Sequence, residues 1–418
     1  MRILLFSSLF PNSVMPQFGL FVQRRAEAVA RRGVQMRVVA PVPYFPGFLP
    51  VPRWRAYAQV PARERLGKTA VTHPRYLHAP GPGMYTQAWS LARAALPHLR
   101  ELRRDFDFQL IDAHYVYPDG VAAVHLARAL GVPCVITARG SDINLLPRHA
   151  LVRRQITSAL QRADALVAVS GALAASMRKL GAPADKLHVI PNGVDRDVFH
   201  HGEPAAGRRK IGIYSDEKML LSVGNLNELK GHALVVEAVA RLRARGIRVS
   251  YHIIGAGEEE SRLEARIAAL GLQGYVHLQG PVANERLRPW YQAASLFVLA
   301  SSREGWPNVL NEALACGTPV VATKVGGVPE IVRHGDNGLL MERSVEAIAA
   351  AIEAGLARDW DRRALAAAAS RTGWGDVAER LVALFAHVCD ASVPGSATPS
   401  PGEEPTTSPA EQVSSAPI

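Results

Sequence analysis

The chain has 418 residues and a mass of 45.1 kDa, and 48% of its residues are hydrophobic and 20% charged. This composition excludes a mostly disordered, collagen-like or disulfide-framework chain, and the length favours two or three domains. No apolar run reaches the roughly 18–20 residues of a membrane-spanning helix, and we interpret the opening ILLFSS as a buried strand. The three cysteines lie far apart without a CxxC pair, which favours a reducing compartment. We therefore expect a cytoplasmic protein.

The positive charge is confined to the first half of the chain. Residues 1–199 hold 26 Lys and Arg against 12 Asp and Glu, a net charge of +14, whereas residues 200–418 hold 22 against 25. A basic field of this kind attracts phosphorylated substrates, anionic membranes or nucleic acid. Because no zinc finger, RNP-type aromatic motif or basic zipper helix accompanies the charge, we do not expect nucleic acid as a partner.

Apolar strand segments alternate with helical segments in the first 200 residues. The strands are apolar on both faces and the helices end at glycines, which is typical of a parallel sheet covered on both sides. Residues 41–90 are rich in proline and aromatic residues and break this rhythm. We interpret them as an excursion from the sheet that faces the substrate. The expected strands cover residues 3–8, 34–40, 110–114, 132–138, 165–170 and 186–191, and the clearest helices cover 19–32 and 119–130.

The alternation restarts after a polar stretch at 200–210, which we interpret as a linker. The sequence thus predicts two doubly wound, Rossmann-like α/β domains that face a cleft. Their expected bounds are 1–200 and 201–373, with an amphipathic helix at 374–390 packing back on the first domain. A tail at 391–418, rich in Ser, Pro, Thr and Glu, is expected to be disordered. The strands expected in the second domain cover residues 219–224, 249–255, 275–280, 295–301, 319–323 and 338–341.

The strongest local signal for chemistry is the segment REGWPNVLNEALACGTPVVAT, which follows an expected strand. In doubly wound folds ligands bind at the carboxyl ends of the strands. A helix that starts near Pro307 would point its free N–H groups at an anion there, and Glu304 and Glu312 would flank that anion. A surface glutamate beside a helix-capping glutamate gives the same pattern, so these residues alone leave both interpretations open.

Several segments together resemble glycosyltransferase family 4, which has the GT-B fold. Besides 303–323, they include VGGVPEIV, VSGALAASM, VIPNGVDRDVF, VGNLNELKGH, IIGAGEE and GPVANERLRPWYQAASLFVLASS, and PQFGLFVQ resembles the family's glycine loop. Within the family, VGNLNELKG and TARGSDIN are most similar to the teichuronic-acid and exopolysaccharide type.

The resemblance implies a role for each matching residue. Lys230 would neutralise the departing diphosphate, Glu304 would contact the donor sugar, and Glu312 would contact the ribose. Arg139 and Asp142, in TARGSD, would stand near the reacting centre. The remaining residues implied in donor binding are Gly19, Asn225, Gly255, Gly257, Val282, Gly305, Asn308 and Val309.

Two positions depart from the family pattern. Asn225 stands where members commonly have an arginine, and Arg139 stands where they commonly have a histidine. Asn225 supplies no charge, and Arg139 is expected to provide the missing cation, because a charge-assisted hydrogen bond is roughly twice as strong as a neutral one. His114 follows a strand, and it either faces the acceptor or is a structural hydrogen-bonding residue.

The function expected from this resemblance is a retaining, metal-independent transferase that moves a sugar from a UDP- or GDP-linked donor. The acceptor would be a glycan or a polyprenyl-diphosphate-linked lipid in surface or exopolysaccharide biosynthesis. The donor would bind the second domain and the acceptor the first, with no cofactor. Two alternatives stay open, namely a sugar-nucleotide epimerase on the same fold and a non-catalytic nucleotide-sugar-binding partner of a polysaccharide assembly complex.

The basic first half also suggests peripheral contact with the inner face of the cytoplasmic membrane. The expected contacts are Arg53 and Arg55 with Trp54 between them, and the cluster of Arg100, Arg103 and Arg104 at helical spacing. Each such residue near an anionic surface contributes about 1 kcal/mol of binding.

Overall fold

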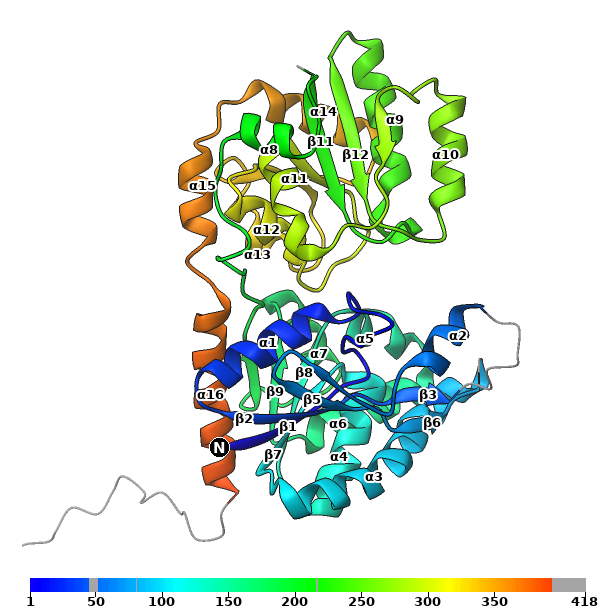
Figure 1. Cartoon of the computed structure of the whole chain (residues 1–418), viewed down its shortest axis with the longest axis vertical. Helices are drawn as coiled ribbons and strands as arrows, with labels where there is room; N and C mark the ends of the chain where they lie inside the picture. The colour runs from blue at the N-terminus through cyan, green and yellow to red at the C-terminus, as the bar shows by residue number, and fades with distance from the viewer. Residues whose placement is uncertain (45–51, 80, 216, 393–418) are drawn as a thin grey trace, which may run out of the picture.

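The computed structural model describes residues 1–44, 52–79, 81–215 and 217–392, apart from the side chains of residues 52–54 and 82. The described chain forms two α/β domains, one above the other, with a long C-terminal helix along one side of the lower one (Figure 1). Each domain is built on its own, mainly parallel sheet. The expected fold class of two doubly wound parallel-sheet domains is confirmed.

The first domain holds an eight-stranded sheet in the order β10-β9-β8-β7-β1-β2-β5-β4. All neighbouring pairs are parallel except β4 with β5. The order runs outward from β1 in both directions, so the carboxyl ends of β1 and β7 meet near the middle of one edge. The strands are β1 (Arg2–Phe6), β2 (Gln35–Val39), β4 (Arg63–Leu66), β5 (Thr69–Thr72), β7 (Leu110–His114), β8 (Cys134–Ala138), β9 (Ala165–Ala168) and β10 (Leu187–Val189).

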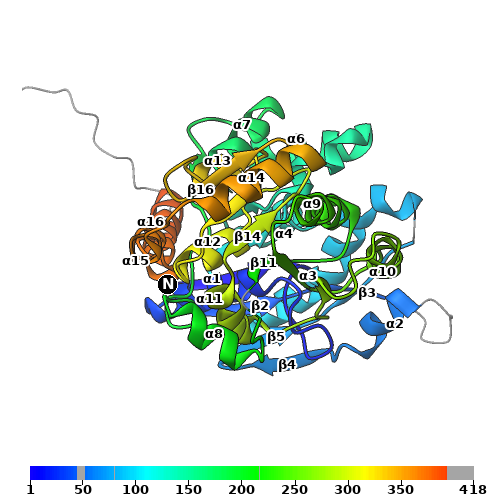
Figure 2. The ribbon, with the colours of Figure 1, turned by 90° about the horizontal axis from the view of Figure 1, so that it is seen from above.

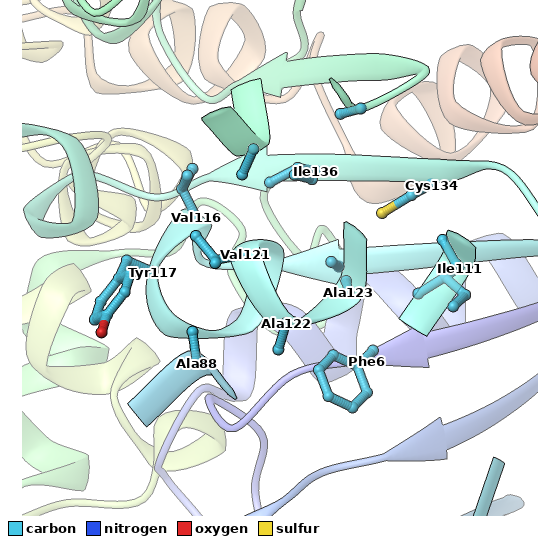
Figure 3. Close-up of a cluster of buried hydrophobic side chains, with 14 of the residues drawn as sticks. Phe6, Ala88, Ile111, Val116, Tyr117, Val121, Ala122, Ala123, Cys134 and Ile136 are labelled. Atoms are coloured by element: carbon cyan, nitrogen blue, oxygen red, sulfur yellow. The ribbon is translucent and has the colours of Figure 1, made fainter. Parts of the chain in front are cut away.

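Helices cover both faces of this sheet, as the two-sided apolar strands require. One face packs against α3, α4 and α6, and Figure 3 shows part of that core, with Phe6 of the sheet near Ala122 of α4. The other face packs against α1 and the C-terminal helix. The helices of this domain are α1 (Leu20–Arg31), α2 (Pro52–Gln59), α3 (Gln87–Asp105), α4 (Val121–Leu130), α5 (Ser141–Asn144), α6 (Ala150–Arg162) and α7 (Gly171–Lys179).

The expected excursion at 41–90 is wrong for part of its length. Its middle returns to the sheet as the hairpin of β4 and β5, which turns at Gly67 with a φ of 58°. Val71 of β5 is buried against the core, so this stretch extends the sheet after all. A separate two-stranded pair joins β3 (Val42–Tyr44) to β6 (Arg75–Leu77) beside it.

The second domain holds a six-stranded, fully parallel sheet in the order β13-β12-β11-β14-β15-β16. The stretch expected as a linker instead contains α8, which packs against α11 because Gly207 lets the two helices approach closely. The strands are β11 (Lys218–Val223), β12 (Val249–Ile254), β13 (Val276–Leu278), β14 (Leu296–Leu299), β15 (Val320–Thr323) and β16 (Gly338–Met341). The helices are α8 (Pro204–Lys210), α9 (His232–Ala244), α10 (Glu260–Ala269), α11 (Arg288–Ala293), α12 (Asn308–Ala315), α13 (Val328–Ile331), α14 (Val345–Ala357) and α15 (Arg362–Ala369).

The last helix, α16 (Trp374–Ala391), leaves the second domain and packs against α1 of the first. It runs beside the start of the chain, as both views show (Figures 1 and 2). Its buried face, which includes Leu381 and Phe385, completes the core that lies under Ile3 and Leu110. The helix continues to Ala391, and the tail expected to be disordered lies, from residue 393 on, outside the described residues.

The residues proposed for membrane contact lie in two separate places. Arg103 of α3 is occupied within the domain, since its guanidinium donates to the Leu130 carbonyl and pairs with Asp107 at 3.3 Å. Arg100 and Arg104 of the same helix are exposed, and so is Arg55 of α2. The side chains of residues 53 and 54 lie outside the description. Within the described residues, no helix is both long and apolar enough to cross a bilayer.

Candidate functional site

A cavity of about 380 Å³ lies between the two domains. The first domain contributes Gln17, Leu20 and Phe21 from the start of α1, and the second contributes the carboxyl ends of β11 and β12 and the start of α12. Because parallel strands direct their carboxyl ends to one edge, residues distant in sequence meet there. Six residues that the sequence implied in donor binding line this cavity, namely Asn225, Gly255, Val282, Asn308, Val309 and Glu312.

Glu312 of α12 is held by two second-domain side chains. The Tyr291 hydroxyl donates to its Oε2 at 2.8 Å, and the Asn284 amide donates to its Oε1 at 3.4 Å. Burial raises the pKa of the Glu312 carboxyl above its usual range. The carboxylate is therefore fixed in orientation at the cavity wall, which suits an acceptor for ligand hydroxyl groups.

Lys230 and Glu304 form a close ion pair beside the cavity. The Lys230 Nζ lies 2.6 Å from the Glu304 Oε1, and the Ser301 hydroxyl donates to the same oxygen at 2.6 Å. Lys230 ends the turn that follows β11, and Glu304 lies in the loop after β14, so the central strands bring them together. The side chains are 25% and 12% exposed, so both remain reachable from solvent. Neither lines the cavity, but Lys230 packs along Gly224, which does.

Arg139 lies behind the first-domain wall of the cavity and does not line it. Its guanidinium donates to the Nδ1 of His114 and, at 2.8 Å, to the Oδ1 of Asn192, and it stacks over the Phe21 ring at 5.0 Å. The Asn192 amide in turn donates to Asn308 at 3.0 Å, across the domain boundary. Arg139 therefore reaches the cavity through Phe21 and Asn192, whereas the sequence suggested direct charge compensation for Asn225.

His114 is wholly buried and lines none of the cavities, so it does not face an acceptor in this structure. Its Nε2 bonds to the Asp112 carboxylate at 3.0 Å, while its Nδ1 accepts from Arg139. Burial lowers the pKa of the imidazole to about 4, so the ring is neutral near pH 7. The structure thus favours the structural alternative for this residue.

Asp142 is buried at the start of α5, and its carboxylate holds the backbone of the preceding loop. It accepts hydrogen bonds from the backbone N–H groups of Val116 at 2.8 Å, Gly140 at 2.7 Å and Arg139 at 3.1 Å. The Asp142 carboxylate is therefore bonded within its own loop and does not line the cavity. In this structure Asp142 positions the Arg139 loop.

The two domains touch where Gly305 meets that loop. A Cβ on Gly305 would lie 2.3 Å from the Arg139 carbonyl oxygen, so only glycine permits this approach. Gly19 is the N-cap of α1 with a φ of 71°, and a Cβ there would lie 2.5 Å from the Leu9 oxygen. Gly255 and Gly257 pack as tightly against the loop after β11. Of these glycines, Gly255 lines the cavity, and the others allow close backbone contacts around it.

Several residues at the boundary between the domains were not singled out from the sequence. Arg24 of α1 lines the cavity and pairs with Glu285 of the second domain at 2.7 Å. Glu330 of α13 accepts from the N–H groups of Gly171 and Ala172, at 2.7 and 2.9 Å, and so contacts the first turn of α7. Asn192 and Glu330 lie in two of the segments that resemble the family, VIPNGVDRDVF and VGGVPEIV. The motifs therefore indicated these segments but not the contacts that the two side chains make.

Comparison with known proteins agrees with this architecture. Residues 19–198 match the family model described as Glycosyltransferase Family 4, and residues 205–372 match the model described as Glycosyl transferases group 1. The glycosyltransferase TuaC of Bacillus subtilis strain 168, named for teichuronic acid biosynthesis, is 30% identical over 358 residues, which is 84% of this chain and 88% of TuaC. This chain belongs to glycosyltransferase family 4. The expected family is therefore confirmed, and the protein is a glycosyltransferase.

Other members of the family and solved structures are also similar. The D-inositol 3-phosphate glycosyltransferase of Acidothermus cellulolyticus is 31% identical over 319 residues, covering 70% of each chain. The structure of sucrose-phosphate synthase from Thermosynechococcus elongatus has a TM-score of 0.77 at 20% identity and covers 93% of this chain and 99% of its own. HepE of Anabaena, solved in complex with UDP, has a TM-score of 0.67 at 21% identity and covers 93% of this chain and 100% of its own. These structures establish the GT-B fold of this glycosyltransferase.

Proposed function

We propose that this glycosyltransferase moves a sugar, with retention of anomeric configuration and without a metal ion, from a nucleotide-diphosphate sugar to a glycan or lipid-linked acceptor. The pathway would be surface or exopolysaccharide biosynthesis, in line with the name of TuaC. The observation that carries the proposal is the cavity between the domains, with Glu312 fixed in its wall and the Lys230–Glu304 pair beside it. The donor would be UDP- or GDP-linked, and no further cofactor would be needed.

The second domain has the chemistry to hold the donor. Glu312 would accept hydrogen bonds from the ribose hydroxyls, and Val282 would pack beside the base. The N–H groups at the start of α12, around Asn308 and Val309, would face the phosphates, since a helix N-terminus favours negative charge. Asn225 and Gly255 complete the walls of this part of the cavity.

The Lys230–Glu304 pair would serve the leaving group and the sugar. As the bond from the sugar to the diphosphate breaks, the already anionic diphosphate gains further negative charge, and a nearby ammonium stabilises that transition state more than the ground state. Donor binding would draw Lys230 toward the diphosphate and leave Glu304 to accept hydroxyls of the sugar. In the mechanism we propose, the donor phosphate deprotonates the acceptor hydroxyl, so neither residue would act as a nucleophile.

The decisive test is transfer by the purified protein across a panel of UDP- and GDP-sugars, with Glu304→Ala beside Glu353→Ala. Glu353 lies on α14 and pairs with Arg245 on the surface, so its loss is a matched carboxylate control. We expect Glu304→Ala to lose at least about a hundredfold in kcat and the control to keep full activity. Full transfer by Glu304→Ala would refute the assignment.

Retention and metal independence need separate measurements. NMR of the product should show the donor's anomeric configuration, and transfer should continue after chelation with EDTA. An inverted product, or activity abolished by EDTA and restored by a divalent cation, would contradict those parts of the proposal. Incubation with donor alone should give no epimerised sugar, which separates transfer from the epimerase alternative.

We also propose peripheral binding to anionic membrane through the basic first domain, with the net charge of +14 over residues 1–199 as its support. Co-sedimentation with phosphatidylglycerol vesicles should be strong at low salt and lost at high salt, because attraction fades beyond a Debye length of about 8–10 Å. Equal binding to neutral vesicles would overturn this proposal. Truncation after residue 392 should leave vesicle binding unchanged, since the removed residues carry only acidic charges.

A further inference from the structure

A second hollow of about 290 Å³ opens at the carboxyl edge of the first-domain sheet. It lies where β1 and β7 end, since Ser8 follows β1 and Tyr115 follows β7. This volume lies near the lower end of the roughly 300–1,000 Å³ that is typical of small-ligand sites. No residue implied in donor binding lines it.

The wall of this hollow is aromatic, with hydroxyl groups among the rings. Phe18, Tyr76, Tyr115 and Tyr117 line it together with Pro41 and Met84. Tyr117 lies at the edge of the first-domain core in Figure 3, and its hydroxyl donates to the Met84 carbonyl. The Gln87 amide donates to the Tyr76 hydroxyl at 3.0 Å. Flat apolar rings with fixed polar groups at their edges suit a ligand that is apolar on one face and hydroxylated around its rim.

Two polar groups of the wall are held in place from behind. While Asp119 is ionised, the Ser8 hydroxyl donates to its carboxylate at 2.8 Å, so the Ser8 oxygen can accept a hydrogen bond from the hollow. Tyr115 has a φ of 83°, which is strained for a residue with a side chain, and its hydroxyl bonds to Ser141 at 2.6 Å. Strain of this kind persists where the surrounding structure enforces it, often at ligand sites.

The hollow lies directly beside the donor cavity. Gln17 and Leu20 line the cavity between the domains, whereas Phe18, between them in the sequence, lines the aromatic hollow. The segment 17–20 therefore contributes to the walls of both spaces. A ligand in the hollow would approach the reacting centre from the first-domain side.

We propose that this aromatic hollow is the subsite for a terminal pyranose ring of the acceptor, with Phe18 as its stacking platform and Ser8 as a hydrogen-bond acceptor for a ring hydroxyl. The inference rests on the proposed transferase function and adds a chemical class of acceptor to it. A polyprenyl chain would pack against the aromatic rings as well as a sugar ring does, but it would leave the oriented Ser8 hydroxyl without a hydrogen-bond partner. The mixed wall therefore favours a sugar over a lipid.

The test is ligand-observed saturation-transfer NMR on the full-length protein with no donor present. The probes are the methyl pyranosides of glucose, galactose, mannose and N-acetylglucosamine, with farnesyl phosphate as a lipid probe. The variants are Phe18→Ala and Ser8→Ala, and the control is Tyr85→Ala. Phe18 and Tyr85 are both 37% exposed aromatic residues of the first domain, but Tyr85 does not line the hollow.

We expect at least one pyranoside to receive saturation from the wild type and from Tyr85→Ala. Its affinity should fall about tenfold or more in Phe18→Ala, as expected for removal of a large apolar contact, and measurably in Ser8→Ala. Saturation of farnesyl phosphate alone, lost in Phe18→Ala, would overturn the proposal in favour of a lipid groove. Pyranoside binding that is unaffected by either variant, or no pyranoside binding, would also overturn it.

A second readout separates this inference from the proposed function. Donor binding is measured by calorimetry with UDP- and GDP-sugars, and Phe18→Ala should keep the donor Kd within about twofold while raising the acceptor KM. If no donor binds the wild type, the proposed function fails whatever the pyranosides do. If donor is bound and transferred but the acceptor KM is the same in Phe18→Ala, only the subsite fails.

Discussion

In both domains the cavity-lining residues lie at the carboxyl edge of the sheet, but the two domains use different chemical groups there. The second domain uses glycine backbone, a helix N-terminus and the carboxylates of Glu304 and Glu312, and its sheet is fully parallel. The first domain uses aromatic rings in front of a buried charged cluster, in which Arg139, His114 and Asp112 bond in series. Its polar groups mostly contact one another, whereas Asn225, Asn308 and Glu312 of the second domain line the cavity.

Under the proposed function, this difference would follow from what each domain binds, namely the donor in the second domain and the acceptor in the first. A nucleotide-sugar donor presents the same phosphates and ribose in each reaction, so a backbone cradle and fixed carboxylates suffice. An acceptor varies among relatives, and side chains on loops adapt more readily than a helix N-terminus. The buried cluster of the first domain then acts as a rigid base that positions the Arg139 loop and the wall in front of it.

Removal of the second-domain cation is expected to have the largest effect. Lys230→Ala should reduce kcat by about 100- to 1000-fold, because the charge developing on the diphosphate loses its nearest ammonium. Lys218→Ala, at the exposed start of β11, is the matched control and should retain full activity. Steady-state kinetics with a saturating donor decide this, and a loss confined to KM would show that Lys230 only binds the donor.

The first-domain cation is expected to matter indirectly. Arg139→Ala should lower kcat/KM more than Asn225→Ala, whose neutral hydrogen bond is worth about 1 kcal/mol. Since Arg139 reaches the cavity through Phe21 and Asn192, its loss should also lower thermal stability, whereas Asn225→Ala should not. The double change Arg139→His with Asn225→Arg restores the common family pattern and should keep substantial activity. Equal losses from the two alanine variants would remove the distinction.

The buried carboxyl behind Ser8 gives the first domain a pH dependence of its own. Burial raises the pKa of Asp119 to about 7, well above its unfolded value near 3.8. Between these values the native state holds a proton that the unfolded chain has released, so stability falls as the pH rises. From about pH 5 to pH 7, wild type should lose on the order of 2–3 kcal/mol relative to Asp119→Asn. Urea unfolding at both pH values measures this, and a difference that does not change with pH would contradict the buried protonated state.

The contact between the domains is expected to give the smallest effect. Glu330→Ala removes an anion from the first turn of α7, which typically costs about 0.5–2 kcal/mol. A lowering of Tm by a few degrees is therefore expected, with Glu264→Ala, at an exposed position inside α10, as control. An unchanged Tm would mean that the contact contributes nothing to holding the domains together.

Sequence patterns determined most of the second domain. The alternation of two-sided apolar strands with helices predicted its six strands within one or two residues, because burial on both faces leaves a continuous apolar run. The spacing of Glu304 and Glu312 after a strand, together with the ordered motifs, pointed to the region of the cavity between the domains, although only Glu312 lines that cavity. The membership of the family followed from the same segments.

Tertiary structure alone decided what the first-domain side chains contact. The sequence does not show that His114 is wholly buried beside Asp112. It also does not show that the Asp142 carboxylate accepts hydrogen bonds from three backbone N–H groups. Arg139 aligns with the family's reactive position in sequence, but the structure places its side chain behind Phe21 and outside the cavity. Local sequence patterns indicate which residues are buried and where strands and helices run. The hydrogen-bond partner of a buried polar group depends instead on which distant segment the packing brings close to it.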